Sequence, residues 1–220
     1  MKMKRVPDDS LEIERLEKML QRETRLWEKG YLSIAGVDEA GRGPLAGPVV
    51  AAGVILTRKK HIEDILVWRD LNDSKQLSQK KREQLYKVIM EHAAAVGVGI
   101  VEADVIDEIN IRQASFEAMR LALMQLDPAS APDFVLADGF LIPGLDLPQE
   151  AVIGGDRASL SIAAASVIAK VTRDRLMEEY DKQYPGYGFA QNKGYPTAEH
   201  RKAIKSLGFT ALHRKSFRVR

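Results

Sequence analysis

The chain has 220 residues, of which 45% are hydrophobic and 29% charged, and its formal net charge is +2. This is the composition of a globular protein, and no apolar run approaches the ~18 residues of a membrane-spanning helix. Cysteine is absent, which excludes disulfides and thiolate metal sites, and the charged start lacks a secretory signal, so we expect a cytoplasmic protein.

The first predicted elements are a helix and two strands. Apolar residues at near-helical spacing predict one amphipathic helix over residues 10–29, with Gly30 as its stop. Buried strands are predicted over 32–37 and 48–56. The short link GRGPLAG between them predicts antiparallel pairing, because parallel strands need a long crossover.

The second half of the chain alternates between helices and strands. Ser78 is predicted to cap a helix. The elements expected after it are strands over 93–101, 134–137 and 151–153, and helices over 103–108, 111–126, 159–180 and 197–207. A strand meander followed by alternation favours an α/β fold with a mixed sheet.

Acidic residues follow three of the predicted strands, namely Asp38, Glu39, Asp138 and Asp156. A single acid in such a place is usually a solvated turn residue or a helix cap. If neighbouring strands bring all four to one sheet edge, like charges raise each other's pKa until a cation neutralises them. Oxygen ligands suit Mg²⁺ or Mn²⁺, and two such ions can activate a water for attack on a phosphodiester. Asp174, within the long helix, is expected to be structural.

Directly after the first two acids comes an arginine between two glycines, Gly41, Arg42 and Gly43. Glycine can adopt a positive φ and lets the backbone approach a ligand, and the arginine supplies a cation. The pattern therefore favours a loop that contacts a sugar-phosphate chain, with a plain tight turn as the alternative. No P-loop pattern and no paired-histidine zinc pattern occurs.

Charge is distributed unevenly along the chain. Residues 182–220 contain nine Lys or Arg and one acid, a net charge of +8, whereas residues 1–181 carry −6. A basic segment of this kind indicates a polyanionic partner, although a solvated basic tail gives the same composition. Lys193, Arg214 and Lys215 are the phosphate contacts we expect from this segment.

Six motifs occur in one order, GVDEAGRGPLAGPVVAAGVIL, NDSKQLS, INIRQAS, LADG, GGDRASLSIAAASVIAKVTRDR and YPGYGFAQNKGYPTAEH. Together, over roughly residues 32–217, they resemble bacterial ribonuclease HII. The resemblance implies a ribonuclease H-like fold with a mixed five-stranded sheet flanked by helices and a helical C-terminal segment. It divides the chain into an N-terminal helical arm, 1–31, and a catalytic domain, 32–220.

The activity implied by this resemblance is cleavage of the RNA strand of RNA/DNA hybrids and nicking of duplex DNA 5′ of an embedded ribonucleotide. The ends would be a 3′-hydroxyl and a 5′-phosphate, and the reactive complex would hold two Mg²⁺ or Mn²⁺ ions. The expected partners are these nucleic acids. No membrane association is expected, and the protein is expected to be a monomer. A non-catalytic nucleic-acid-binding module is the alternative, but a pure binder gains nothing from an acidic cluster that faces a polyanion.

The motifs also imply roles for individual residues. Asp38, Glu39, Asp138 and Asp156 resemble the catalytic metal ligands, and the run Gly41, Arg42 and Gly43 resembles the sensor of the ribose 2′-hydroxyl. Tyr195 resembles a tyrosine that stacks on the sugar at the RNA–DNA junction, with a core tyrosine as the alternative. The residues expected to contact the substrate backbone are Lys75, Asn110, Gln113 and Lys193.

Overall fold

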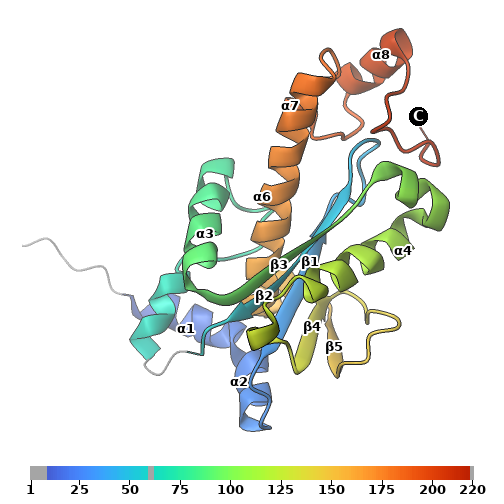
Figure 1. The fold of residues 1–220 in the computed structure, drawn as a ribbon. Helices are drawn as coiled ribbons and strands as arrows, with labels where there is room; N and C mark the ends of the chain where they lie inside the picture. The colour runs from blue at the N-terminus through green and yellow to red at the C-terminus, as the bar shows by residue number, and fades with distance from the viewer. Residues whose placement is uncertain (1–8, 59–61, 219–220) are drawn as a thin grey trace, which may run out of the picture.

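The computed structural model describes residues 9–58 and 62–218, which fold around one five-stranded sheet (Figure 1). The strands are β1 Ile34–Ala40, β2 Val49–Leu56, β3 Ala93–Val101, β4 Phe134–Asp138 and β5 Gln149–Val152, in the order β3-β2-β1-β4-β5. The first three strands are antiparallel neighbours, whereas β4 pairs parallel to β1 and β5 parallel to β4. The predicted mixed five-stranded sheet is therefore confirmed.

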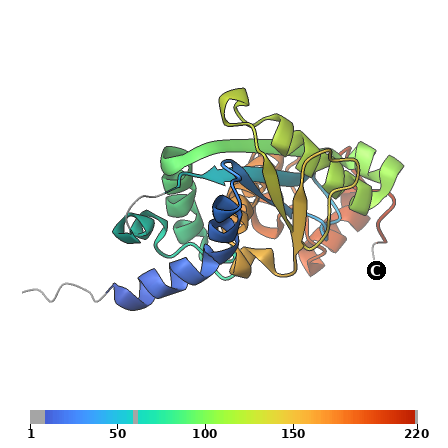
Figure 2. The ribbon, with the colours of Figure 1, turned by 90° about the horizontal axis from the view of Figure 1, so that it is seen from below.

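Helices cover both faces of the sheet (Figures 1 and 2). They are α1 Ser10–Met19, α2 Gln21–Glu28, η1 Ile62–Trp68, α3 Gln79–His92, α4 Ala103–Met124, η2 Pro128–Ser130, α5 Gly155–Ala158, α6 Leu160–Gln183, α7 Phe189–Asn192 and α8 Ala198–Leu207. One core lies between the sheet and α1, α3 and α6, and a second core lies between the sheet and α4. Within the described ranges, no helix is long and apolar enough to cross a membrane.

The alanine-rich half of α6 lies directly on the sheet. Ala163, Ala164 and Ala165 are fully buried, and their small side chains let the helix axis approach the strands. On β1 the residue that meets this helix is Gly36, where a Cβ atom would collide with the backbone of Ser161. The start of α6 and the centre of β1 are thus in backbone contact, just before the acids.

The first strand begins two residues later and ends three residues later than the sequence predicts. β1 continues past residue 37 and includes Asp38 and Glu39, because both residues pair with β2 opposite Ala52 and Ala51. The two acids therefore belong to the strand, close to its C-terminal end, and do not follow it. Because side chains alternate along a strand, neighbouring acids in β1 point to opposite faces of the sheet.

Other boundaries also differ from the predictions. The arm is interrupted at Leu20 between α1 and α2, and α4 joins the two predicted helices across Asn110, whose φ is +67°. The strand predicted over 151–153 ends at Val152, so Asp156 lies in the single helical turn α5 and not at a strand end. The Ser78 cap is confirmed, since its hydroxyl accepts a hydrogen bond from Lys81 N.

The C-terminal segment returns to the β1–β2 turn. His213 forms a β-bridge with Ala46, and α7, α8 and the C-terminal segment lie together at this end of the molecule (Figure 1). A small apolar core that includes Tyr187, Phe189 and Leu212 supports this packing. The glycine-rich turn and the basic segment are therefore neighbours, although about 170 positions separate them in sequence.

Candidate active site

The fold brings the four predicted acids together. Val37 pairs with Ala137 in the parallel ladder, so the residues that follow, Asp38 and Asp138, lie on neighbouring strands at the same level. Glu39 is next along β1, and the turn α5 brings Asp156 to the end of β4. Backbone hydrogen bonds fix this arrangement, because Asp138 Oδ1 accepts from Gly155 N at 2.7 Å and Asp38 Oδ1 accepts from Glu39 N at 2.7 Å.

Burial and mutual repulsion act on these carboxylates. Burial, then the charges of Glu39 and Asp138, raises the pKa of Asp38 well above its ordinary value. Burial likewise raises the pKa of Glu39, although Arg42 opposes the shift. The pKa of Asp156 is raised by burial and then by Asp73. The cluster therefore carries more negative charge than its surroundings neutralise.

Two exposed cations partly balance the acids. Arg42 Nη1 lies 3.2 Å from Glu39 Oε1, and Lys75 Nζ lies 3.6 Å from Asp156 Oδ2. Burial lowers the pKa of Lys75, but Asp38, Asp156 and other nearby carboxylates together raise it. The side chains of Arg42 and Lys75 are 46% and 77% exposed, so neither cation is fixed in the interior.

The donor set fits a hard divalent cation, although the side chains do not yet converge on one. In the described part of the chain, no three acidic or histidine side chains are arranged as a ready ligand set. Asp38 and Asp138 each give one oxygen to a backbone N–H, and Glu39 and Asp156 face Arg42 and Lys75. Carboxylate oxygens are nevertheless the donors that Mg²⁺ and Mn²⁺ prefer, and an ion would supply the missing positive charge.

A fifth acid, which the sequence analysis missed, lies beside this cluster. Asp73 is 1% exposed and accepts a hydrogen bond from Lys75 N at 2.9 Å. It also lies 3.4 Å from a guanidinium nitrogen of Arg157. Asp73 belongs to the motif NDSKQLS, but it follows no predicted strand, so the strand-end pattern could not select it. Its charge is one reason why the pKa of Asp156 is raised.

The two glycines of the loop have different roles. Gly41 has a φ of +99°, and a Cβ atom there would collide with the side chain of Arg173. The protein's own packing therefore requires a glycine at position 41. Gly43 does not have a positive φ, so its backbone does not use this freedom of glycine, and its contact with substrate stays a prediction. A Cβ atom on Gly43 would meet only Tyr195 Cε1, at 3.6 Å, which leaves this side of the loop open.

Two buried arginines support the loop from beneath. Arg214 donates hydrogen bonds to the carbonyl oxygens of Gly41, Arg42, Pro44 and Gly47. Arg173 donates to the carbonyl oxygens of Ala46, Pro48 and Lys193. Each arginine is 1% exposed. Burial, then the charge of Arg173, lowers the pKa of Arg214 to about 9, and burial lowers the pKa of Arg173 to about 10.

This arrangement corrects one prediction for the basic segment. Arg214 was expected to contact phosphate, but its guanidinium is buried and bound to loop carbonyls, so that prediction is wrong. Lys193 is also engaged by the protein, with Nζ 2.7 Å from Glu178 Oε1 and a side chain that is 13% exposed. The basic residues that remain exposed include Lys215 and three residues of α8, Arg201, Lys202 and Lys205.

Tyr195 lies at the open side of the loop. Its ring is 44% exposed, so the alternative of a core tyrosine is wrong. Leu45 N donates to the Gly194 carbonyl at 2.8 Å, and the Tyr195 carbonyl lies 2.9 Å from Nδ1 of His200. The backbone on both sides of the ring is therefore held against the loop and against α8.

The remaining residues predicted to contact the substrate are held by the protein in different ways. Asn110 caps the second half of α4, because its Oδ1 accepts hydrogen bonds from Arg112 N and Gln113 N. Gln113 is exposed. Asp174 pairs with Lys170 at 2.7 Å, which agrees with the structural role expected for it. Substrate contacts of Asn110, Gln113, Lys75 and Lys193 remain predictions.

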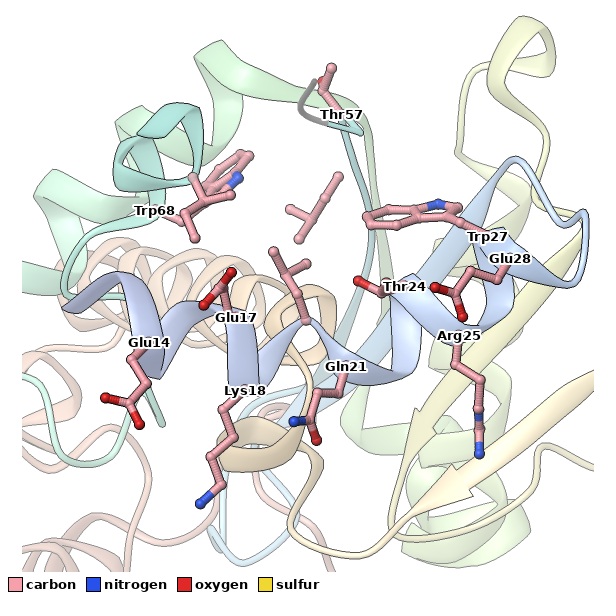
Figure 3. Close-up of a pocket in the computed structure, with 13 residues that line it drawn as sticks. Glu14, Glu17, Lys18, Gln21, Thr24, Arg25, Trp27, Glu28, Thr57 and Trp68 are labelled. Carbon is pink, nitrogen blue, oxygen red and sulfur yellow. The ribbon is translucent and has the colours of Figure 1, made fainter. Parts of the chain in front are cut away.

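The site is open and not a deep cavity. A cavity of about 700 Å³ lies between the N-terminal arm and η1, with Trp27 and Trp68 among its lining residues (Figure 3). None of the four acids lines it. Glu39 and Asp138 instead border a small hollow beside α4, together with Arg42. A site outside a deep cavity admits a long polymer, which a closed cavity would exclude.

Comparisons with known proteins agree with these observations. The family model described as ribonuclease HII matches residues 35–220. The chain is 50% identical over 206 residues to ribonuclease HII of Clostridioides difficile, covering 94% of this chain and 78% of that one. It is 57% identical over 195 residues to ribonuclease HII of Leuconostoc mesenteroides, covering 89% and 74%. The crystal structure of ribonuclease H2 from Pyrococcus horikoshii superposes with a TM-score of 0.71 at 28% identity, covering 86% and 95%.

Proposed function

We propose that this chain, which belongs to the ribonuclease HII family and is therefore a ribonuclease H endonuclease, cuts its substrates at the four-carboxylate cluster. The substrates are RNA/DNA hybrids and duplex DNA that contains single ribonucleotides, nicked on the 5′ side of the ribonucleotide. The products carry a 3′-hydroxyl and a 5′-phosphate. The observation that carries this proposal is the buried group of like charges whose counter-charges are exposed side chains.

The residues that would hold divalent metal are Asp38, Glu39, Asp138 and Asp156. Bound Mg²⁺ or Mn²⁺ would activate the attacking water and stabilise the leaving oxygen. The chain's own cations have a complementary task. Arg42 and Lys75 neutralise Glu39 and Asp156 in the free protein, and both side chains have the exposure and length to turn toward phosphates when the carboxylates bind metal.

Recognition of the ribonucleotide is assigned to the loop Gly41, Arg42 and Gly43 and to Tyr195 beside it. Gly43 leaves the outer side of the loop open, and the Tyr195 ring stands next to it. A sugar seated on this surface would present its 2′-hydroxyl to the loop backbone around Arg42. The neighbouring sugar would lie on the face of the Tyr195 ring. Because the loop rests on Arg214 and Arg173, it is preorganised before substrate arrives.

A nicking assay tests this proposal. Three duplexes are compared in Mg²⁺ or Mn²⁺: DNA with one embedded ribonucleotide, a long RNA/DNA hybrid, and all-DNA of the same sequence. We expect the first two to be cut, with EDTA abolishing cleavage and added metal restoring it. Because hydrolysis of one phosphodiester should leave a 3′-hydroxyl beside a 5′-phosphate, a ligase that requires a 5′-phosphate should reseal the nick directly. Cleavage that persists in EDTA would contradict the metal role.

The alternative, a non-catalytic binding module, gives a different result in the same experiment. Such a protein would shift all three duplexes in a binding assay without nicking any of them in either metal. The carboxylates argue against it, since placing negative charge beside phosphates weakens binding unless a cation intervenes.

A further inference from the structure

A buried carboxylate outside the cluster lies in the N-terminal arm, which we define as α1 and α2, residues 10–28. Glu23, on α2, is 1% exposed. Its Oε1 accepts three hydrogen bonds from the start of α6: from Ser159 Oγ at 2.6 Å, from Ser161 N at 3.0 Å and from Ser161 Oγ at 2.7 Å. A carboxylate is favourable at the amino end of a helix, where backbone N–H groups lack partners.

The arm also holds the turn that precedes this helix. Arg22, the neighbour of Glu23, donates from Nη1 to the Ala158 carbonyl at 3.0 Å. Ala158 is the last residue of α5, the four-residue turn that carries Asp156. At the other end of α5, Gly155 N donates a hydrogen bond to Asp138 Oδ1 at 2.7 Å. α5 is thus attached to the arm on one side and to the carboxylate cluster on the other.

The contact with Ser161 also reaches the first strand. Gly36 on β1 is in such close contact with Ser161 that a Cβ atom would collide with the backbone of that residue. Asp38 follows Gly36 by two residues on the same strand and the same face. Displacing Ser161 would therefore disturb the strand that carries Asp38 as well as the turn that carries Asp156.

A single-turn helix cannot hold its own position. Four residues make too few internal hydrogen bonds to be stable alone, so outside contacts decide where α5 lies. Among the described residues, Glu23 Oε2 has no hydrogen-bond partner, although it is buried. A buried acceptor without a partner is costly, so the three bonds at Oε1 must repay that cost.

From these contacts we infer that Glu23 is a positioning residue: through Ser159 and Ser161 it fixes α5 and so sets the place of Asp156 in the metal-binding cluster. The arm then belongs to the catalytic unit, although the family match begins only at residue 35. The inference rests on the proposed role of Asp156 as a metal ligand. Partners that orient a metal ligand typically change metal affinity by roughly 10- to 100-fold.

The test compares four variants of the full chain, Glu23→Ala, Glu23→Gln, Asp156→Asn and Leu16→Ala. Two quantities are measured for each: the rise in melting temperature as Mn²⁺ is added, and the Mn²⁺ concentration that gives half-maximal nicking. Leu16 is the matched control, because it is fully buried in α1 within the core that α1 shares with α3 and α6. Its truncation weakens the arm without removing the contacts of Glu23.

We expect Glu23→Ala to raise the half-saturating Mn²⁺ concentration about tenfold and to reduce the Mn²⁺-induced rise in melting temperature. Glu23→Gln keeps an oxygen that can accept the same hydrogen bonds, so it should stay within about threefold of the parent. Leu16→Ala should lower the melting temperature without Mn²⁺ but leave the half-saturating concentration unchanged.

Three results would overturn the inference. Equal Mn²⁺ requirements for Glu23→Ala and Leu16→Ala would mean that the arm contributes stability only. If the half-saturating Mn²⁺ concentration is unchanged in Glu23→Ala but changes greatly in Asp156→Asn, Glu23 is not a positioning residue and the proposed function stands. If Asp156→Asn itself leaves both measurements unchanged, Asp156 is not a metal ligand, and the proposed function fails at that residue together with the inference.

Discussion

Two groups of buried like charges lie beside each other in the fold, one beneath the loop that follows β1 and one at the end of β1, and their partners differ. Below the loop, Arg173 and Arg214 donate to carbonyl oxygens with their guanidinium nitrogens. At the end of β1, Asp38 and Glu39 have raised pKa values, and the main counter-charge of Glu39 is the exposed Arg42.

The difference separates a structural element from a binding site. A buried charge that is fully hydrogen-bonded has no remaining capacity for a ligand, and its removal leaves carbonyl groups without partners. A buried charge held near others of its own sign is unstable alone and is stabilised by whatever neutralises it. We therefore expect substitutions in the arginine pair to cost stability and substitutions in the carboxylate cluster to cost activity.

The largest expected effect is at Asp38. Asp38→Asn should reduce nicking by about a thousandfold or more, because metal ions supply several kcal/mol to the transition state. Since the raised pKa means that the ionised carboxylate destabilises the folded state, this variant should melt at least as high as the parent at pH 7. Single-turnover nicking in saturating Mn²⁺ and a melting curve measure both effects.

Asp174→Asn is the control for that substitution. Asp174 is a buried acid that pairs with Lys170, and it should show the reverse pattern, a lower melting temperature with nicking largely retained. Turnover of Asp38→Asn at the rate of the parent would contradict the role of Asp38 as a metal ligand. The carboxylate cluster would then no longer differ in function from the arginine pair.

Arg214→Met should have the opposite signature from Asp38→Asn. It leaves four loop carbonyls without their donor, and breaking a buried charged network costs about 3–5 kcal/mol. Denaturant titration measures the loss of unfolding free energy. Methionine is similar in size and apolar, so it limits the cavity contribution. A stability close to that of the parent would show that the loop does not depend on Arg214.

A third buried pair, His200 and His213, should stay neutral. The ring nitrogens are 3.2 Å apart, and burial, then the charge of His200, lowers the pKa of His213 to about 4. The unfolded chain binds this proton more readily, near pH 6.5. The stabilisation is therefore complete above pH 6.5 and is lost as the pH falls toward 4, by about 2–3 kcal/mol.

Unfolding free energies at pH 7.5 and pH 4.5 check this prediction, with His213→Gln as the reference. The raised pKa values of Asp38 and Glu39 act in the opposite direction, since their contribution to stability is lost as the pH rises. Only the difference between the parent and His213→Gln isolates the histidine. An identical pH dependence in the two proteins would contradict the assignment.

Tyr195 should separate substrate recognition from both stability and chemistry. Stacking on a nucleotide is worth roughly 1–3 kcal/mol, so Tyr195→Ala should slow nicking at a single ribonucleotide by about 10- to 100-fold. Cutting within a long hybrid should suffer less, and Tyr195→Phe should keep most activity. The ring is 44% exposed, so the melting temperature should change little. Equal losses on both substrates would count against junction recognition.

The smallest expected effect concerns the basic surface. Arg201, Lys202 and Lys205 are exposed on α8, and the described residues provide no ion-pair partner for them. If they contact phosphates, replacing all three with alanine should flatten the log–log dependence of binding on salt by up to about 0.9 per residue. Lys182→Ala is the control, because Lys182 already pairs with Glu179 at 2.8 Å. An unchanged slope in the triple variant would favour a solvated surface.

Much of the fold was readable from local pattern. Strand β3 was predicted with its observed bounds, and α6 within three residues at its end, because apolar periodicity and capping residues such as Ser159 are local signals. The boundary at Asp38 was missed, since an acid in a strand is locally unfavourable and only pairing with β2 keeps the chain extended there.

The sequence also determined which residue types could form the site. Acids near the ends of predicted strands, together with an arginine between glycines, indicate Asp38, Glu39, Asp138 and Asp156. Their proximity could be predicted because strand order in an α/β fold brings such positions to one edge of the sheet, whereas their role as metal ligands stays a prediction.

Only the tertiary structure decided how each charge is used. Arg214 and Lys193 have the same local appearance as exposed basic residues, yet one is buried under loop carbonyls and the other is paired with Glu178. The contacts of Glu23 with the start of α6 likewise join positions 136 and 138 residues apart. Whether a charged side chain is a structural support or part of a site depends on the partners that distant segments bring to it, and no local pattern in the sequence records those partners.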